Sequence, residues 1–135
     1  MIVVKTSIKP SNISGIGAFA DEKILKGTTV WKYDPHFDVS FSSKEVEKMD
    51  SLQRELIGKY AYHSPESKKY IYPIDNARFI NHSSINNNLD VVPFPREVET
   101  RAVANRDIEV GEKLLLNYRM IDADDAKSTE EYLKN

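Results

Sequence analysis

The sequence predicts a mainly β domain with one helical insertion. Short runs of β-branched and aromatic residues recur along the chain, and turn formers separate them at close spacing. One longer internal stretch has apolar residues at helical spacing. The 135 residues suit one domain, and 40% hydrophobic with 30% charged residues is typical of a folded chain. Strands and helices do not alternate regularly, which disfavours a doubly wound dinucleotide-binding fold.

The first half of the chain supplies strands on either side of the helical stretch. We expect strands at residues 1–9, 18–21 and 28–32. Residues 10–17 are rich in turn formers and separate the first two of these strands. Over 43–60, apolar residues recur at helical spacing behind Ser42 and Glu45, which form a capping-box pattern. This predicts one helix, or two short helices with a break near Asp50.

The second half of the chain contains more short strands. We expect them at residues 70–74, 91–94, 101–105 and 114–118. Because proline cannot donate a hydrogen bond to a neighbouring strand, Pro73 must lie either in an edge strand or at the end of its strand. The apolar pair 79–80 is followed by turn chemistry over 83–88. Ser128 and Glu131 form a second capping pattern, which predicts a short terminal helix.

The composition excludes several classes of site. The chain has no cysteine, so a disulfide scaffold, a Cys-ligated zinc site, an iron–sulfur cluster and a cysteine nucleophile are excluded. His36, His63 and His82 lie far apart in sequence, so we expect no metal site. Neither a membrane-spanning apolar run nor a signal peptide is present. We therefore expect a cytoplasmic protein, or a nuclear one in a eukaryote, that is not secreted.

The charges are unevenly placed along the chain. The net charge of −2 is too balanced for a dedicated nucleic-acid-binding protein. Residues 1–118 contain 16 acidic and 16 basic residues, whereas 119–135 contains five acidic and three basic residues. The whole net charge therefore lies in the tail. The tail is either a solvated segment or an acidic rim that attracts a basic substrate.

Three motifs are candidates for function. Residues 15–20 read GIGAFA, a G-x-G pattern that by itself is more typical of a structural turn. Residues 78–83 read RFINHS, and a polar stretch follows that either satisfies its own backbone or recognises a polar ligand. Residues 111–118 read GEKLLLNY, which places a phenol in the core or at the floor of a pocket. A serine hydrolase using His82 and Ser83 is disfavoured, since no G-x-S-x-G elbow accompanies them.

Taken together and in this order, the motifs resemble those of the SET-domain protein lysine methyltransferases over about residues 2–118. In that family a G-x-G stretch follows the first strand, R-F-x-N-H-S-C-x-P-N lies mid-chain and G-E-E-L-x-x-D-Y closes the domain. Residues 24–27 and 107–112 also match. The resemblance implies a β-clip-like fold of small sheets with a knot-like C-terminal threading, in which 76–88 and 111–118 lie side by side.

The resemblance also implies a domain organisation. Residues 1–118 would form the SET domain, and 42–68 would be its variable helical insertion. Residues 119–135 would form an acidic C-terminal tail with a short helix. Because the zinc-binding flanks common in the family are absent, the substrate channel would be completed by this tail or by a partner chain, for which a homodimer is one arrangement.

The activity that the resemblance implies is transfer of a methyl group from S-adenosylmethionine to the amine of a lysine in a protein, without a metal. A basic protein would suit the acidic tail, and we expect neither nucleic acid nor a membrane as a partner. Tyr118 would be the catalytic residue, and Tyr118 and Tyr132 would line the substrate channel. The implied cofactor-binding residues are Gly15, Ile16, Gly17, Tyr72, Arg78, Phe79, Asn81 and His82.

Four positions depart from the family pattern. Ser84 replaces a usual Cys, Asn86 a usual Pro, Lys113 a usual Glu and Asn117 a usual Asp. Asn81, His82 and Tyr118 are retained, which favours an active enzyme. The departures leave a second hypothesis open, that of a SET-like module that binds a peptide or protein without catalysis.

Overall fold

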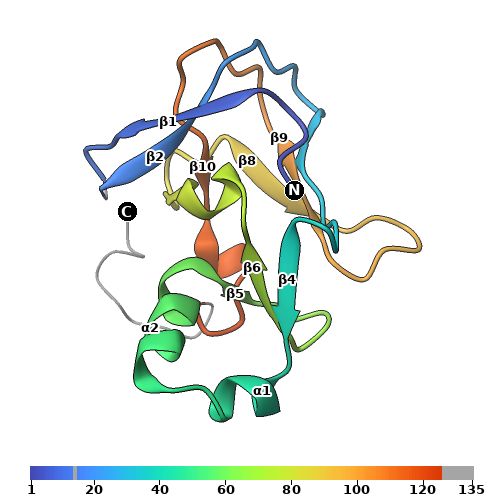
Figure 1. Ribbon diagram of the computed structural model, residues 1–135. Coiled ribbons are helices and arrows are strands. Elements are labelled where there is room, and N and C mark those ends of the chain that lie inside the picture. Colours follow the sequence, from blue (N-terminus) through green and yellow to red (C-terminus); the bar gives the residue numbers. More distant parts are fainter. Residues whose placement is uncertain (14, 126–135) are drawn as a thin grey trace.

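The computed structural model describes residues 1–13 and 15–125 and consists mainly of small β-sheets (Figure 1). One sheet has two strands, one has five in the order β3-β9-β8-β10-β7, and one has three in the order β4-β6-β5. The mainly β architecture with few helices is the one that the sequence predicts. The knot-like threading stays a prediction, and the expected terminal helix lies outside the described residues.

The strand bounds define each sheet. The two-stranded sheet pairs β1 (Thr6–Pro10) with β2 (Ile16–Ala20). The five-stranded sheet contains β3 (Thr29–Trp31), β7 (Asn81–His82), β8 (Leu89–Val92), β9 (Arg101–Ala104) and β10 (Leu115–Leu116). The three-stranded sheet contains β4 (Asp38–Phe41), β5 (Tyr62–His63) and β6 (Tyr70–Pro73).

Strand β10 lies between β7 and β8 and runs parallel to both. Leu115 and Leu116 pair with Asn81 and His82 on one side, and Leu116 pairs with Leu89 on the other. This register confirms that 76–88 and 111–118 lie side by side. It brings the second and third sequence motifs into direct contact.

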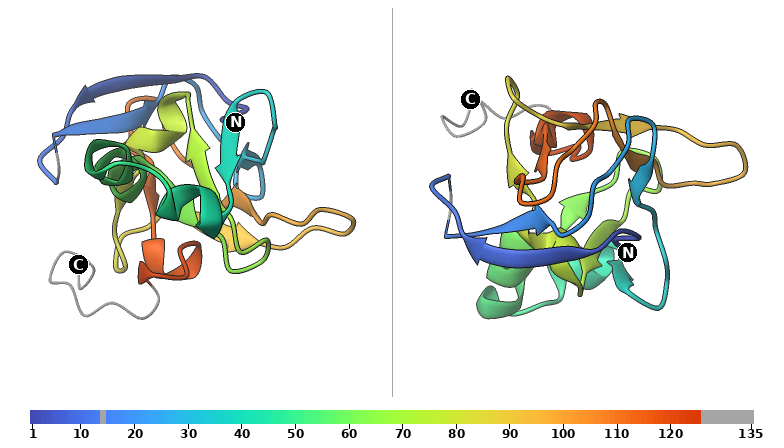
Figure 2. Two further views of the ribbon diagram at one scale, coloured as in Figure 1. Left: turned by 60° about the horizontal axis from the view of Figure 1, so that its bottom comes forward. Right: turned by 90° about the horizontal axis from the view of Figure 1, so that it is seen from above.

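The helical stretch forms two short helices, α1 (Ser43–Glu47) and α2 (Ser51–Tyr60). Each begins with a capping box, formed by Ser42 with Glu45 and by Asp50 with Gln53. The break at Asp50 is therefore confirmed, because its side chain caps the second helix. The two helices lie at the end of the molecule away from the β1–β2 hairpin, and the loop between β8 and β9 extends outward (Figures 1 and 2).

Some strand predictions require correction. Pro73 ends β6, as one of the two alternatives requires, but β6 is the central strand of its sheet and not an edge. The opening strand begins at Thr6 rather than at residue 1, and Ile2 makes only an isolated bridge. The predicted strand 114–118 is limited to two residues. Tyr118 begins a 3-10 turn instead, because the Asn117 side chain accepts a hydrogen bond from the amide of Arg119.

One apolar core joins the sheets. Its most buried large members are Ile24, Val30, Ile71, Leu89, Ile108 and Leu114. Among the described residues, the helices are too short and too polar to cross a membrane.

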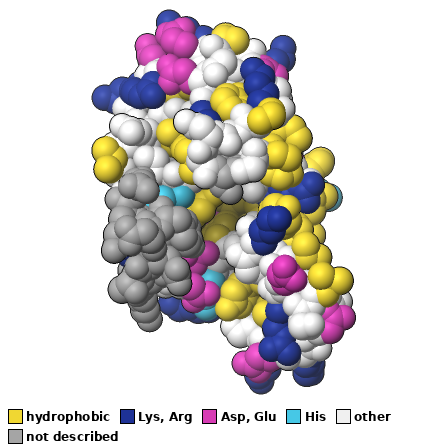
Figure 3. Space-filling model, turned by 90° about the vertical axis from the view of Figure 1, so that its left-hand side faces the viewer, with side chains coloured by type: hydrophobic (Ala, Val, Ile, Leu, Met, Phe, Trp, Pro, Cys, Tyr) yellow, Lys and Arg dark blue, Asp and Glu magenta, His cyan; other side chains and the backbone are white. Residues whose placement is uncertain are grey.

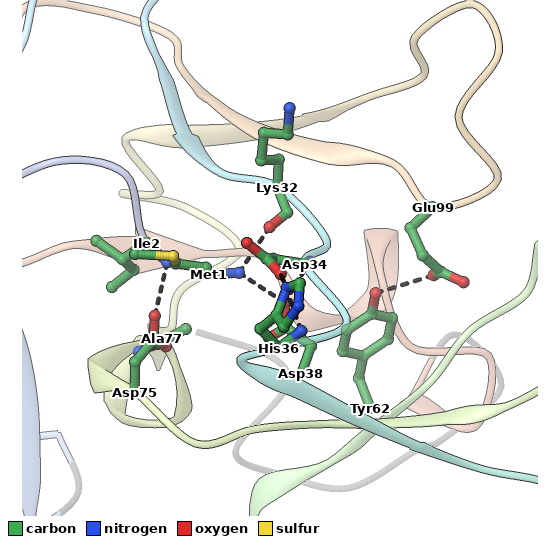
Figure 4. Close-up of polar contacts among 10 residues, drawn as sticks. All are labelled: Met1, Ile2, Lys32, Asp34, His36, Asp38, Tyr62, Asp75, Ala77 and Glu99. Atoms are coloured by element: carbon green, nitrogen blue, oxygen red, sulfur yellow. Dashed lines mark hydrogen bonds and ion pairs between the residues drawn. The ribbon is translucent and has the colours of Figure 1, made fainter.

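A polar network ties the start of the chain to the second motif (Figure 4). Asp38, only 1% exposed, accepts from the Met1 ammonium at 2.6 Å and from the amide of Asp34 at 2.8 Å. Burial raises the pKa of the Asp38 carboxyl, and the ammonium opposes this rise. Asp75 accepts from the amide of Ile2 at 2.8 Å and caps the 3-10 helix η1 (Asn76–Phe79). The second motif is thereby held against the core.

Candidate active site

A pocket of about 520 Å³ lies between the helical end of the molecule and the five-stranded sheet. Its size is typical of sites for small molecules and cofactors. Six residues of the second and third motifs line it, namely Arg78, Ile80, Asn81, His82, Leu116 and Tyr118. Aromatic side chains from other elements line it as well, namely Trp31, Tyr60, Tyr62 and Tyr70. Figure 3 shows this face, with hydrophobic side chains inside the hollow and acidic and histidine side chains beside it.

The G-x-G turn packs directly against Asn81. Gly15 has a φ of +36°, and a Cβ built on Gly17 would lie 2.9 Å from Asn81 Oδ1. The Asn81 side chain accepts from Ser11 Oγ at 2.8 Å and donates to the carbonyl of Ile16 at 3.4 Å. It is 6% exposed. The first two motifs are therefore joined by one buried amide, although Gly15, Ile16 and Gly17 stand beside the pocket rather than among its lining residues.

Tyr118 is held at both ends by the second motif. Its amide donates to His82 Nδ1 at 3.0 Å, and the two rings lie 5.1 Å apart. Because Nδ1 accepts this hydrogen bond, the neutral His82 ring carries its proton on Nε2. The Tyr118 hydroxyl donates to the backbone carbonyl of Ile80. Tyr118 and Asn81 thus lie at one pocket, as a shared site requires.

Tyr60 is a site residue that the motifs did not identify. The Arg78 guanidinium lies 5.3 Å from the Tyr60 ring and 4.8 Å from the Phe79 ring. Tyr60 also makes edge contacts with Tyr72 and Phe79, at centroid distances of 6.0 and 6.2 Å. Arg78 and Tyr60 line the pocket, whereas Tyr72 and Phe79 support them from behind. Tyr60 is the last residue of the apolar helical spacing over 43–60, and this was the sequence signal by which it could have been identified.

The far side of the pocket is aromatic and was not predicted. Trp31 and Tyr62 make an edge-to-face contact at 6.0 Å. The Tyr62 hydroxyl donates to Glu99 Oε1 at 2.9 Å. Burial raises the pKa of the Tyr62 hydroxyl well above its usual range, and the negative charge of Glu99 adds to this rise. Tyr62 belongs to a two-residue strand, which has no detectable sequence period.

The described part of the acidic tail forms one wall of the pocket. Asp122, Asp124 and Asp125 are lining residues. His63 binds this segment through its amide to Asp122 Oδ2 at 3.2 Å and through Nδ1 to Asp124 Oδ1 at 3.0 Å. The amide of Ala123 donates to the carbonyl of His63 at 2.7 Å. Burial raises the pKa of the Asp122 carboxyl. Tyr132, the predicted channel residue, lies outside the described residues.

Metal-ligating side chains do not gather in the part of the chain that the structure describes. No group of three or more His, Asp or Glu residues occurs there in an arrangement suited to a metal ion. The polar groups at the pocket are an amide, hydroxyls, imidazoles, the Lys59 ammonium, the Arg78 guanidinium and carboxylates. They are suited to binding an organic ligand with both positive and negative groups.

Comparisons with known proteins agree with this geometry. The family model of the SET domain matches residues 15–119. A candidate histone methyltransferase of Plasmodium falciparum superposes with a TM-score of 0.57 at 22% identity, over 84% of this chain and 92% of that chain. CpSET8 of Cryptosporidium superposes with a TM-score of 0.60 at 26% identity, over 84% of this chain and 56% of that one.

A larger assembly contains a similar domain. A chain of the Chaetomium thermophilum polycomb repressive complex 2 superposes with a TM-score of 0.59 at 22% identity. The superposition covers 85% of this chain but only 15% of that chain. This likeness therefore concerns the fold of one domain within a much longer protein. No curated protein sequence matches the chain significantly.

Proposed function

This chain belongs to the SET-domain family, and from that membership we propose that it transfers a methyl group from S-adenosylmethionine to the side-chain amine of a protein lysine. The observation that carries the proposal is the double attachment of Tyr118 to the second motif, through His82 Nδ1 and the Ile80 carbonyl. This attachment gathers the family's most characteristic residues at one pocket of suitable size.

The donor set of the pocket fits this cofactor. Arg78 offers a guanidinium for a carboxylate, and its position over Tyr60 and Phe79 restricts its movement. His82 and the backbone of β7 offer polar groups, and the aromatic rings offer flat surfaces for a purine. When bound, the cofactor supplies an electrophilic methyl group on a sulfonium. We propose that Arg78, His82 and Tyr60 are its principal contacts.

Asn81 has a different role in this proposal from the one that the resemblance implied. Its side-chain amide is already bonded to Ser11, which precedes the G-x-G turn, and to Ile16 within it. Asn81 therefore acts by positioning the turn, and it is the residue of this contact that lines the pocket. The glycine is required because Asn81 occupies the space that a Cβ would need.

The chain's own residues meet the chemical demands of amine methylation. A free lysine has a pKa near 10.4, whereas the reaction needs the neutral amine. Apolar and aromatic walls disfavour the ammonium form and so help deprotonation. Because the Tyr118 hydroxyl donates to Ile80, its oxygen presents electron density to electropositive atoms. Its two attachments also fix the direction of the phenol, and orientation of this kind can lower a barrier by several kcal/mol.

The departures from the family pattern are accommodated locally. Asn117 caps the turn at Tyr118 through Oδ1, which accepts from the amide of Arg119 at 3.1 Å. Ser83 Oγ accepts from the amide of Asn86 at 2.8 Å and shapes the loop without proline. These contacts favour an active enzyme over the alternative of a binding module without catalysis. The acidic wall at Asp122, Asp124 and Asp125 supports a basic protein as substrate.

The test uses labelled cofactor and a mixture of lysine-rich proteins. We expect label transfer by the native protein, and a loss of about 10²-fold or more in Tyr118→Phe because the group beside the reacting atoms is removed. Tyr33→Phe is the control, since Tyr33 does not line the pocket. Unchanged transfer in Tyr118→Phe would contradict the assigned role. Binding of cofactor or peptide without turnover on any substrate would favour the binding module.

A further inference from the structure

Glu99 is a buried carboxylate without a cationic partner in the described structure. It is 6% exposed, and no Lys, Arg or His of the described residues forms an ion pair with it. Among the described residues its side chain is hydrogen-bonded to the Tyr62 hydroxyl, which donates to Oε1 at 2.9 Å. Buried carboxylates are usually paired with a cation, because an uncompensated buried charge is costly. The position of Glu99 therefore needs an explanation.

Tyr62 connects this charge to the pocket. It lines the pocket, whereas Glu99 lies directly behind it, and Figure 4 shows the Tyr62 hydroxyl pointing to the Glu99 carboxylate. Because the hydroxyl proton is directed to Glu99, the Tyr62 oxygen acts as an acceptor toward the pocket. Only a hydrogen-bond donor is complementary to that oxygen.

Trp31 adds a second attraction for a positive charge. Its ring packs edge-on against Tyr62 at 6.0 Å, and both rings line the pocket. Aromatic faces attract cations, and the attraction grows when the cation is withdrawn from water. An acceptor oxygen, two aromatic rings and a buried negative charge behind them together favour an ammonium group.

We propose that Tyr62 and Glu99 form the amine-recognising end of the pocket and select a lysine side chain over an uncharged side chain of the same length. This inference rests on the proposed function and specifies how the substrate is selected. Glu99 acts through Tyr62 and touches neither reacting atom, so it is a positioning and specificity residue. The charge on Glu99 attracts the ammonium form that a free lysine has at neutral pH, so it acts when the side chain binds, and the amine loses its proton afterwards, beside the apolar walls and the sulfonium.

Glu99 should therefore lower the stability of the free protein and strengthen the binding of lysine. Glu99→Gln keeps the size of the side chain and an oxygen that accepts from Tyr62, but it removes the buried charge. We expect the free variant to unfold at a higher temperature than the native protein, because a neutral amide replaces a largely buried carboxylate that has no cationic partner among the described residues. If Glu99 served only to stabilise the fold, Glu99→Gln would unfold at a lower temperature than the native protein.

The binding test uses the fluorescence of Trp31, the one tryptophan of the chain. Two decapeptides are titrated without cofactor, identical except that a central lysine is replaced by norleucine. We expect the native protein to prefer the lysine peptide by about tenfold or more. Glu99→Gln and Tyr62→Phe should each reduce this preference to near unity. In turnover, Glu99→Gln should raise KM for the lysine peptide more than it lowers kcat.

Glu97→Gln is the matched control. Glu97 lies two residues earlier and is paired with Arg101 at 2.7 Å, outside the pocket. It should keep the native preference for lysine. An unchanged preference in both Glu99→Gln and Tyr62→Phe would overturn the inference, as would a lower unfolding temperature in Glu99→Gln. Selective lysine binding without methyl transfer would support the inference and contradict the proposed function, so the two failures are distinguishable.

Discussion

Gly17→Ala tests whether the contact between the first two motifs holds the site together. The added methyl would lie 2.9 Å from Asn81 Oδ1, 3.2 Å from Ser11 Cβ and 3.3 Å from Phe19 Cε2. The amide of Asn81 cannot move away without breaking its hydrogen bonds to Ser11 and Ile16. The substitution therefore either displaces Asn81 or pushes the hairpin outward.

The cost can be estimated from the type of contact. Overpacking a well-packed site costs about 1–3 kcal/mol, and losing a buried hydrogen bond adds about 1 kcal/mol. We therefore expect Gly17→Ala to lower the free energy of unfolding by about 2–4 kcal/mol. Gly58→Ala is the control, because a Cβ at this helical position meets no atom within 4 Å. It should raise the stability by about 0.5–1 kcal/mol, since alanine favours the helix.

Urea unfolding followed by circular dichroism measures both variants, and calorimetry with S-adenosylmethionine measures binding below the unfolding transition. We expect Gly17→Ala to bind the cofactor at least about tenfold more weakly than the native protein while it is still folded. The reasoning is refuted if Gly17→Ala matches the native protein in stability and in affinity. It is also refuted if Gly58→Ala is the more damaging of the two substitutions.

Two further predictions concern the third motif and the acidic wall. Asn88→Ala should lower the stability by about 2–4 kcal/mol in urea, because it removes the partners of the Lys113 carbonyl and the Leu115 amide, whereas Asn86→Ala at an exposed position should change it little. Burial raises the pKa of the Asp122 carboxyl, so the folded protein binds a proton there at a higher pH than the unfolded chain does. The contribution of Asp122 to the free energy of unfolding therefore falls as the pH rises through the raised pKa. Asp122→Asn should remove that dependence above about pH 4, the ordinary pKa of an aspartate, and an unaltered pH profile would show that the carboxyl is not the group concerned.

The residues of the site were predictable where a motif contains them and not where only packing brings them together. Gly17, Asn81 and Tyr118 stand in motifs with fixed spacing; Asn81 and Tyr118 lie where the second and third motifs meet, and Gly17 packs against Asn81. Tyr62 and Glu99 belong to a two-residue strand and to a loop, so neither has a periodic pattern around it. Their pairing spans 37 positions and depends on the assembled fold.

The same distinction explains the errors in the fold. The helices were predictable, because capping boxes and apolar spacing are local signals. Strand β7 consists of the polar residues Asn81 and His82, and it is a strand only because β10 pairs with it. Of the two alternatives for Pro73, the strand terminus is the correct one, and local sequence could not decide between them because a proline at the end of a strand is compatible with any position in a sheet. Long-range pairing overrides local propensity in these elements.

The position of β10 between β7 and β8 determines when this part of the five-stranded sheet can form during folding. Its partners β7 and β8 precede it in the chain by about thirty residues, and it fills the place between them. Such pairing requires closure of a long loop and forms late in folding. During synthesis, β7 and β8 therefore leave the ribosome before the strand that pairs with both of them. The contact between Tyr118 and His82 cannot form until β10 has emerged.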